Sequence, residues 1–121
     1  MEGQLWVEPV GELIIARVRG IPTEALLKEC QDRVVALANE IQQSLVLYDA
    51  LEMVAPSVDV AWSQRSLDKQ LIIPLRRAIV VTNTRLAYLA RLAFADGDYR
   101  VFYNEIAAAI EWLKSGALAS K

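Results

Sequence analysis

The stretch that most constrains the fold is residues 44–51, which read Ser-Leu-Val-Leu-Tyr-Asp-Ala-Leu. Its apolar core runs without interruption, and a helical pattern of apolar residues lies on each side of it. This arrangement predicts a central strand that is buried on both faces, as in an α/β sheet. Because ligands of open α/β sheets bind beyond the carboxyl ends of the parallel strands, we expect any site near the loop that follows.

The composition fits one domain with a dense core. The chain has 121 residues, of which 55% are hydrophobic, and its mean hydropathy is +0.26. We expect a single domain over residues 1–121 that needs no disulfide. No apolar run approaches the roughly 18 residues of a membrane span, and the acidic, polar start is unlike a signal peptide. These features predict a cytoplasmic protein, in which the apolar excess could also cover an oligomer interface.

The residue types argue against most catalysis. Histidine is absent, and Cys30 is the one cysteine, so the commonest general base and the commonest transition-metal ligand are both missing. No glycine-rich phosphate loop and no cysteine-based metal spacing occurs. We therefore expect no enzyme activity, no catalytic residue, no metal and no cofactor. A net charge of −2 favours no nucleic acid, although the basic residues of 61–100 either form a face for an anionic partner or pair with the acidic first half.

The periodicity of apolar residues and the position of turn-forming and capping residues predict nine elements in the order β-β-α-β-α-β-α-β-α. The first two strands form a hairpin, and the alternating units that follow predict a mixed, mostly parallel sheet of about five strands. Thr23 and Asn104 are expected to cap helices, and Gly116 to end the last helix before a frayed tail, residues 116–121. The expected strands are 4–8, 12–19, 44–51, 75–82 and 99–103, and the expected helices are 24–43, about 58–72, 85–95 and 105–114.

Two polar residues follow the central strand. Asp49 lies where we expect that strand to end, and it either binds a ligand hydroxyl or a metal, or caps its own turn. Ser57 is a capable N-cap for the next helix. Cys30 falls inside the apolar stripe of the first helix, which indicates a small buried side chain instead of a reactive thiol.

A second candidate site is the turn Thr82-Asn83-Thr84-Arg85, at the carboxyl end of a parallel strand. Free amides at a helix start favour anions, and Arg85 adds charge, so the turn is either an anion site or an ordinary capped helix start. The aromatic residues Tyr48, Trp62 and Tyr88 either line a ligand pocket between 52–73 and the helix after this turn, or belong to the core.

The final third of the chain resembles the SpoIIAA-like group of the STAS superfamily, the STAS/SEC14-domain proteins. The resemblance lies in residues 77–82, Arg-Ala-Ile-Val-Val-Thr, and in the segments 86–94, 99–103 and 107–113. It implies the family's fold. Anti-sigma-antagonist relatives carry a phosphorylatable serine after the third strand, usually in an Asp-Ser pair. Ser57 is near that place and becomes the phosphorylation candidate, but it stands in Ala-Pro-Ser-Val. SEC14-type relatives imply an apolar ligand instead.

Two functions therefore remain open. The first is a non-enzymatic regulatory or interaction module. It binds a protein partner, or its own copy as a homodimer, through the segment 52–73 and the surface after the central strand. The second is a carrier or sensor of a small apolar or anionic ligand. A hydrolytic enzyme has less support than either, because no base can be named for it. A cavity would favour the carrier, and an exposed apolar patch would favour the interaction module.

Overall fold

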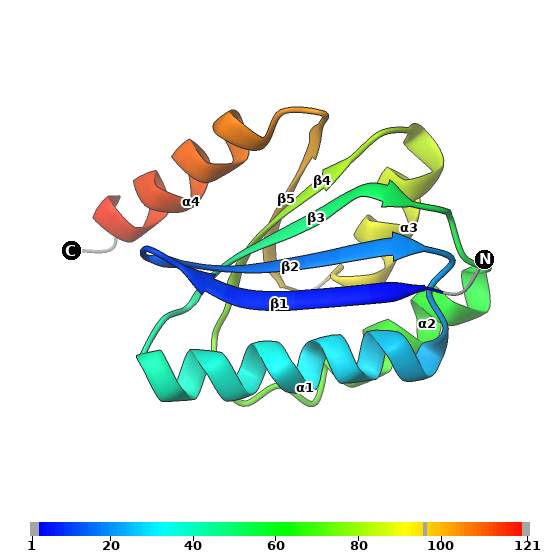
Figure 1. Cartoon of the computed structure of the whole chain (residues 1–121), viewed down its shortest axis with the longest axis horizontal. Helices are drawn as coiled ribbons and strands as arrows, with labels where there is room; N and C mark the ends of the chain where they lie inside the picture. The colour runs from blue at the N-terminus through cyan, green and yellow to red at the C-terminus, as the bar shows by residue number, and fades with distance from the viewer. Residues whose placement is uncertain (1–2, 96, 120–121) are drawn as a thin grey trace.

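The chain folds as strands and helices in the predicted order (Figure 1), as a computed structural model of residues 3–95 and 97–119 shows. The bounds are β1 Gln4–Val10, β2 Leu13–Gly20, α1 Glu24–Ile41, β3 Leu45–Met53, α2 Val58–Asp68, β4 Arg76–Val81, α3 Thr84–Ala93, β5 Asp98–Tyr103 and α4 Ile106–Ala119. Within this described part, no helix is both long enough and apolar enough to cross a membrane.

The five strands lie side by side in the order β1-β2-β3-β4-β5. β1 runs antiparallel to β2 through a tight hairpin, and β2, β3, β4 and β5 are parallel. Gly11 has φ 59° in the hairpin turn, a conformation that glycine adopts without strain. The predicted mixed, mostly parallel sheet is confirmed.

Helices cover the two faces of the sheet unequally. α1 packs on β1 and β2, α3 packs on β4 and β5, and α2 contacts both helices. α4 packs on β3, β4 and β5 from the opposite face, on the far side of the sheet from α1 (Figure 1). Because β3 and β4 have helices on both sides, their side chains are buried in both directions, as the apolar run of residues 45–48 predicted. The α4 face is filled by Leu13, Leu45, Leu47, Ala78, Val80, Ala109 and Leu113.

The central strand is longer than its sequence pattern indicated. β3 continues to Met53, where it pairs with Gly20 of β2, after an irregularity in register between Arg17 and Arg19. Asp49 is therefore inside β3 and not at its end, and the Leu51 amide donates to the Asp49 carboxylate at 3.1 Å. The extension depends on pairing with a distant strand, which local periodicity does not reveal.

α2 is shorter than expected and ends at Asp68 instead of about residue 72. Leu71 and Ile73 pack toward α1 while the side chain of Ile72 between them is 95% exposed. This alternation is that of an extended segment. Asp68 pairs with the buried Arg77 of β4, so the end of α2 is fixed by an ion pair.

The last helix also differs from the prediction. α4 begins at Ile106 and continues through Gly116 to Ala119, so Gly116 does not end it. Asn104 has φ 59°, and its amide donates to the Val81 carbonyl at 2.9 Å; it joins β5 to α4 without occupying the N-cap position. Residues 120–121 of the predicted frayed tail are outside the described part of the chain, and the fraying stays a prediction.

Candidate functional site

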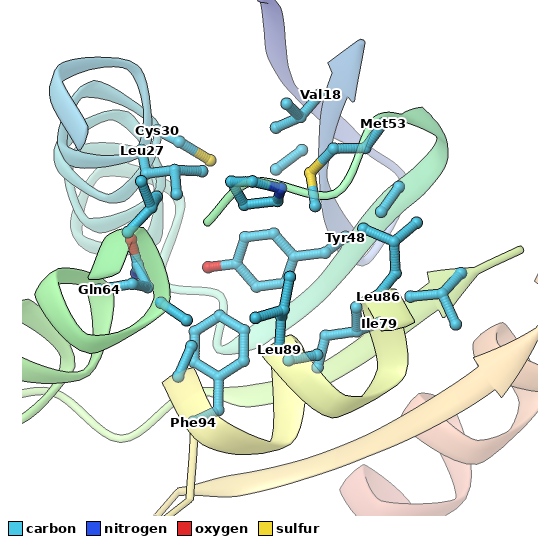
Figure 2. A pocket seen from close by; sticks show the side chains of 18 of the residues that line it. Val18, Leu27, Cys30, Tyr48, Met53, Gln64, Ile79, Leu86, Leu89 and Phe94 are labelled. Atoms are coloured by element: carbon cyan, nitrogen blue, oxygen red, sulfur yellow. The ribbon is translucent and has the colours of Figure 1, made fainter. Parts of the chain in front are cut away.

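A cavity of about 90 Å³ lies between the sheet and the three helices α1, α2 and α3 (Figure 2). The strands β2, β3 and β4 form its floor, and the start of α2 with the loop before it contributes Pro56 and Val60. Most of the wall is apolar because these elements turn their core stripes toward one another. The apolar wall includes Val18, Leu27, Met53, Ile79, Leu86 and Leu89.

Tyr48 extends from β3 into this cavity. Its ring stacks on Phe94 with 5.6 Å between the ring centroids, and Figure 2 shows its hydroxyl directed to the side on which Cys30 and Gln64 lie. Burial raises the pKa of the Tyr48 hydroxyl well above its ordinary value. The group is therefore a neutral hydrogen-bonding hydroxyl at physiological pH.

Two glutamines from different helices bring amide groups to the same wall. Gln31 of α1 donates to the Leu67 carbonyl of α2 at 3.0 Å. Gln64 of α2 donates in turn to the Gln31 Oε1 at 3.1 Å. The Gln64 side-chain oxygen is buried and has no hydrogen-bond partner, so it is an unused acceptor in an apolar surrounding.

Cys30 also lines the cavity, and the structure confirms the prediction that it is a buried apolar residue of α1. Burial is the largest cause that raises the pKa of the Cys30 thiol to about 12, against a smaller opposing effect of Arg33. The thiol stays protonated at neutral pH and is a poor nucleophile.

A buried ion pair adjoins this region. Arg77 of β4 is 3% exposed, and its guanidinium pairs with both oxygens of Asp68. The same guanidinium lies 4.5 Å from the centroid of the Phe94 ring, the ring on which Tyr48 stacks. The pair anchors the end of α2 on the sheet and so holds one wall of the cavity in place.

The structure separates the candidate residues predicted after β3. Asp49 lines the cavity, where one of its oxygens is already used by the Leu51 amide. Ser57 occupies the N-cap position of α2 as predicted, but its side chain makes no capping hydrogen bond. Its hydroxyl is exposed on the surface.

The aromatic candidates also separate. Tyr48 lines the cavity, whereas Trp62 and Tyr88 are 49% and 52% exposed and are not among its lining residues. The Arg65 guanidinium lies 5.3 Å from the Trp62 ring centroid. Trp62 is therefore a surface residue of α2.

The turn before α3 is a capped helix start. Asn83 is the N-cap and accepts a hydrogen bond from the Leu86 amide at 2.8 Å. Thr82, Asn83 and Arg85 are all exposed, so the structure offers no enclosed anion pocket at this turn, and anion binding there stays a prediction. Among residues 3–95 and 97–119, no group of three or more acidic or thiol side chains is placed to hold a metal ion.

Sequence reasoning missed Gln31 and Gln64 as site residues. They are 33 positions apart, so no local spacing joins them. A weak signal exists, because Gln31 lies one turn after Leu27 and one turn before Val34 on the buried stripe of α1, a position that usually holds an apolar residue.

The sequence matches one known protein family. The family model described as SpoIIAA-like matches residues 13–114. The chain belongs to the SpoIIAA-like family. No curated protein sequence matches it significantly.

Two solved structures share the fold of this SpoIIAA-like chain. An anti-sigma factor antagonist from Mycobacterium paratuberculosis has a TM-score of 0.65 at 10% identity, over 93% of this chain and 94% of that one. An uncharacterized protein with a SpoIIAA-like fold from Shewanella loihica PV-4 has a TM-score of 0.64 at 18% identity, over 92% of this chain and 93% of that one. At these identities the likeness supports the fold.

Proposed function

We propose that this SpoIIAA-like chain is a non-enzymatic regulatory module that binds a protein partner at the carboxyl ends of β2 and β3 and on α2. We define this region, the β3–α2 surface, by Ile21, Val54, Ser57 and Trp62. The observation that carries the proposal is the exposure of its three large apolar side chains, at 43% for Ile21, 50% for Val54 and 49% for Trp62. Exposed apolar side chains at two adjacent strand ends and on the helix that follows indicate an interaction surface.

The two strand ends are held together. The Val54 amide donates to the Gly20 carbonyl at 2.9 Å, so Ile21, which follows Gly20, lies beside Val54. A partner would meet a prearranged apolar pair and lose little entropy in ordering it. The similar structure that is called an anti-sigma factor antagonist supports a partner that is itself a regulatory protein, and a cytoplasmic location.

Ser57 is the residue at which we propose that this binding is switched. Its hydroxyl is exposed at the N-cap of α2 and free of a capping bond. A phosphate there would place nearly two negative charges on the β3–α2 surface, next to the helix N-terminus that favours them and near Asp59 that opposes them. Ser57→Asp should therefore weaken partner binding more than Ser57→Asn does.

The partner experiment expresses variants of the whole chain in cells of its source, crosslinks them, and measures the amount of partner that is recovered with each variant. Val54→Asp and Trp62→Ala should each reduce this amount at least tenfold, because hot-spot residues near the centre of an interface dominate its affinity. Ile72→Ala is the matched control, since Ile72 is exposed but lies in the α2–β4 connection. Equal recovery from all three variants and the wild type would contradict the proposed surface.

A second candidate function is the binding of a small molecule, and the cavity with its unused acceptor at Gln64 favours it. Mass spectrometry of the natively purified chain should then show an added mass that is lost on denaturation. A chain that carries no such mass, and binds no probe of suitable size, would contradict this second function.

A further inference from the structure

The orientation of the Gln64 amide is fixed by a chain of hydrogen bonds. The Leu67 carbonyl can only accept, so it must face the Gln31 Nε2. The Gln31 oxygen then faces Gln64 and requires its Nε2 as donor. A flipped Gln64 would set two oxygens against each other, so its own oxygen must be the atom left without a partner.

The unpaired Gln64 oxygen lowers the stability of the folded chain. Gln64 is 8% exposed, and a buried acceptor without a donor keeps the whole penalty of its desolvation. A ligand that offers one N–H or O–H would remove this penalty. The cavity therefore favours a molecule that donates a hydrogen bond.

The remaining lining excludes an anionic ligand. Asp49 is the charged residue that lines the cavity among the described residues, and no lysine or arginine lines it. A carboxylate would enter an apolar space against the oxygens of Gln64 and Asp49. Arg77, the cation that acts on the Tyr48 hydroxyl, is already paired with both oxygens of Asp68. Size adds a further limit, because a cavity of 90 Å³ is smaller than the cavity of about 150 Å³ that binds one benzene molecule.

We propose that the cavity binds a small, uncharged and mostly apolar molecule whose hydroxyl or amide group donates a hydrogen bond to the Gln64 side-chain oxygen. A short-chain alcohol has this chemistry, as does the hydroxyl-bearing tip of a longer chain. The proposal rests on the second function above, ligand binding by the cavity, and adds the class of ligand.

The test uses three small probes, two of which differ in the ability to donate a hydrogen bond, while the third carries a negative charge. 1-Butanol and methyl propyl ether are isomers, and only the alcohol can donate a hydrogen bond; butyrate adds the negative charge. Each is titrated into the full chain labelled with ¹³C at its methionine methyl groups, and the Met53 signal reports the cavity. We expect the alcohol to bind about fivefold more tightly than the ether, as one net hydrogen bond predicts, and butyrate not to saturate.

Variants assign the difference to one atom. Gln64→Leu should remove the preference for the alcohol and keep the ether affinity, and Gln64→Met serves if the leucine variant does not fold. Gln70→Leu is the control, because Gln70 is an exposed glutamine outside the cavity, and it should keep the preference. Equal affinity for alcohol and ether in the wild type would overturn the ligand class but leave ligand binding standing. If none of the three probes moves Met53, the ligand function and this inference both fail.

Discussion

At the scale of single residues, two ionisable groups in the cavity are held neutral. Cys30 and Tyr48 both have raised pKa values, and burial is the first cause for each. Arg33 lowers the pKa of Cys30 and Arg77 lowers that of Tyr48, but each offsets only part of the effect of burial. At neutral pH both side chains are uncharged and pack in the core. At high pH they favour the unfolded state, in which they can release their protons.

We expect the chain to lose stability as the pH rises above about 9. The unfolded thiol releases its proton near its ordinary pKa of 9.0, whereas folded Cys30 keeps it to about 12. The folded state therefore binds more protons in this window, and its free energy of unfolding falls by about 1.4 kcal/mol per pH unit. Below pH 9 the contribution is fully present.

Urea unfolding at pH 8, 9 and 10 measures this slope. Cys30→Ala removes the thiol, so its stability should depend less steeply on pH than that of the wild type, whatever its stability at pH 8. Tyr48 adds its own loss only above its ordinary pKa of 10.0, which keeps the two effects apart. Identical slopes in both proteins would show that the thiol is not the titrating group.

Single residues also show what a sequence can and cannot predict about this site. Cys30 was predicted correctly because its place in an apolar stripe is a local property of α1. Trp62 and Tyr88 were expected either in a pocket with Tyr48 or in the core, but both are about half exposed, since the rotation of α2 and α3 about their axes depends on neighbours. The acceptor at Gln64 is defined by Gln31 on another helix, and no short pattern reports that contact.

At the scale of elements, the starts of α1, α2 and α3 differ in how they are capped. The Thr23 side chain accepts from the Leu26 amide at 3.1 Å and that of Asn83 from the Leu86 amide at 2.8 Å. Ser57 occupies the same position of α2 without such a bond. All three residue types are good caps in a sequence, so the difference lies in the geometry of the incoming loop.

Alanine substitution should separate these caps. Thr23→Ala and Asn83→Ala each remove a bond to a helix amide, and we expect each to lower the free energy of unfolding by about 1 kcal/mol. Ser57→Ala removes no such bond and should cost less than about 0.5 kcal/mol. Urea unfolding at pH 7 gives the three values; a Ser57→Ala cost as large as that of Asn83→Ala would mean that Ser57 does cap α2 in solution.

The order of elements followed from the sequence because each signal is local. Gly11 marks the hairpin, Thr23 starts α1, and the apolar run of residues 45–48 marks the central strand. The bounds were less accurate where a distant partner sets them. Met53 belongs to β3 because it pairs with β2, and α2 ends at Asp68 because Arg77 holds that residue.

At the scale of the whole molecule, one part of the sheet remains uncovered. α4 packs on β3, β4 and β5, and Leu13 at the start of β2 is buried in the same cluster, whereas the described helices leave most of this face of β1 uncovered. Trp6 of β1 is 44% exposed there, with the Arg17 guanidinium 5.4 Å from its ring centroid. Arg17 and Arg19 both pair with Glu52, so the exposed apolar residues of β1 on this surface are Trp6 and Val10, which is 45% exposed.

β1 is also an edge strand, and its pairing defines which backbone groups are free. Val10 and Leu13 close the two-residue turn, and hydrogen-bonded pairs alternate with open pairs from there. The backbone groups of Leu5, Val7 and Pro9 then face the open edge, where Pro9 has no N–H to donate. The other edge strand, β5, carries Asp98 and Arg100, charges that disfavour edge pairing.

If the chain pairs with its own copy, one of the two kinds of partner predicted, we expect antiparallel pairing of β1 with β1 of the second copy, which would also cover Trp6. Val7→Pro removes an outward N–H that β2 does not use, so it should weaken dimerisation at least tenfold and keep the hydrogen bonds between β1 and β2. Pro9→Ala supplies an outward N–H and should strengthen dimerisation. Native mass spectrometry over a range of protein concentrations measures both changes. A wild-type chain that stays monomeric at every concentration, or a Val7→Pro dimer as tight as that of the wild type, would contradict pairing through β1.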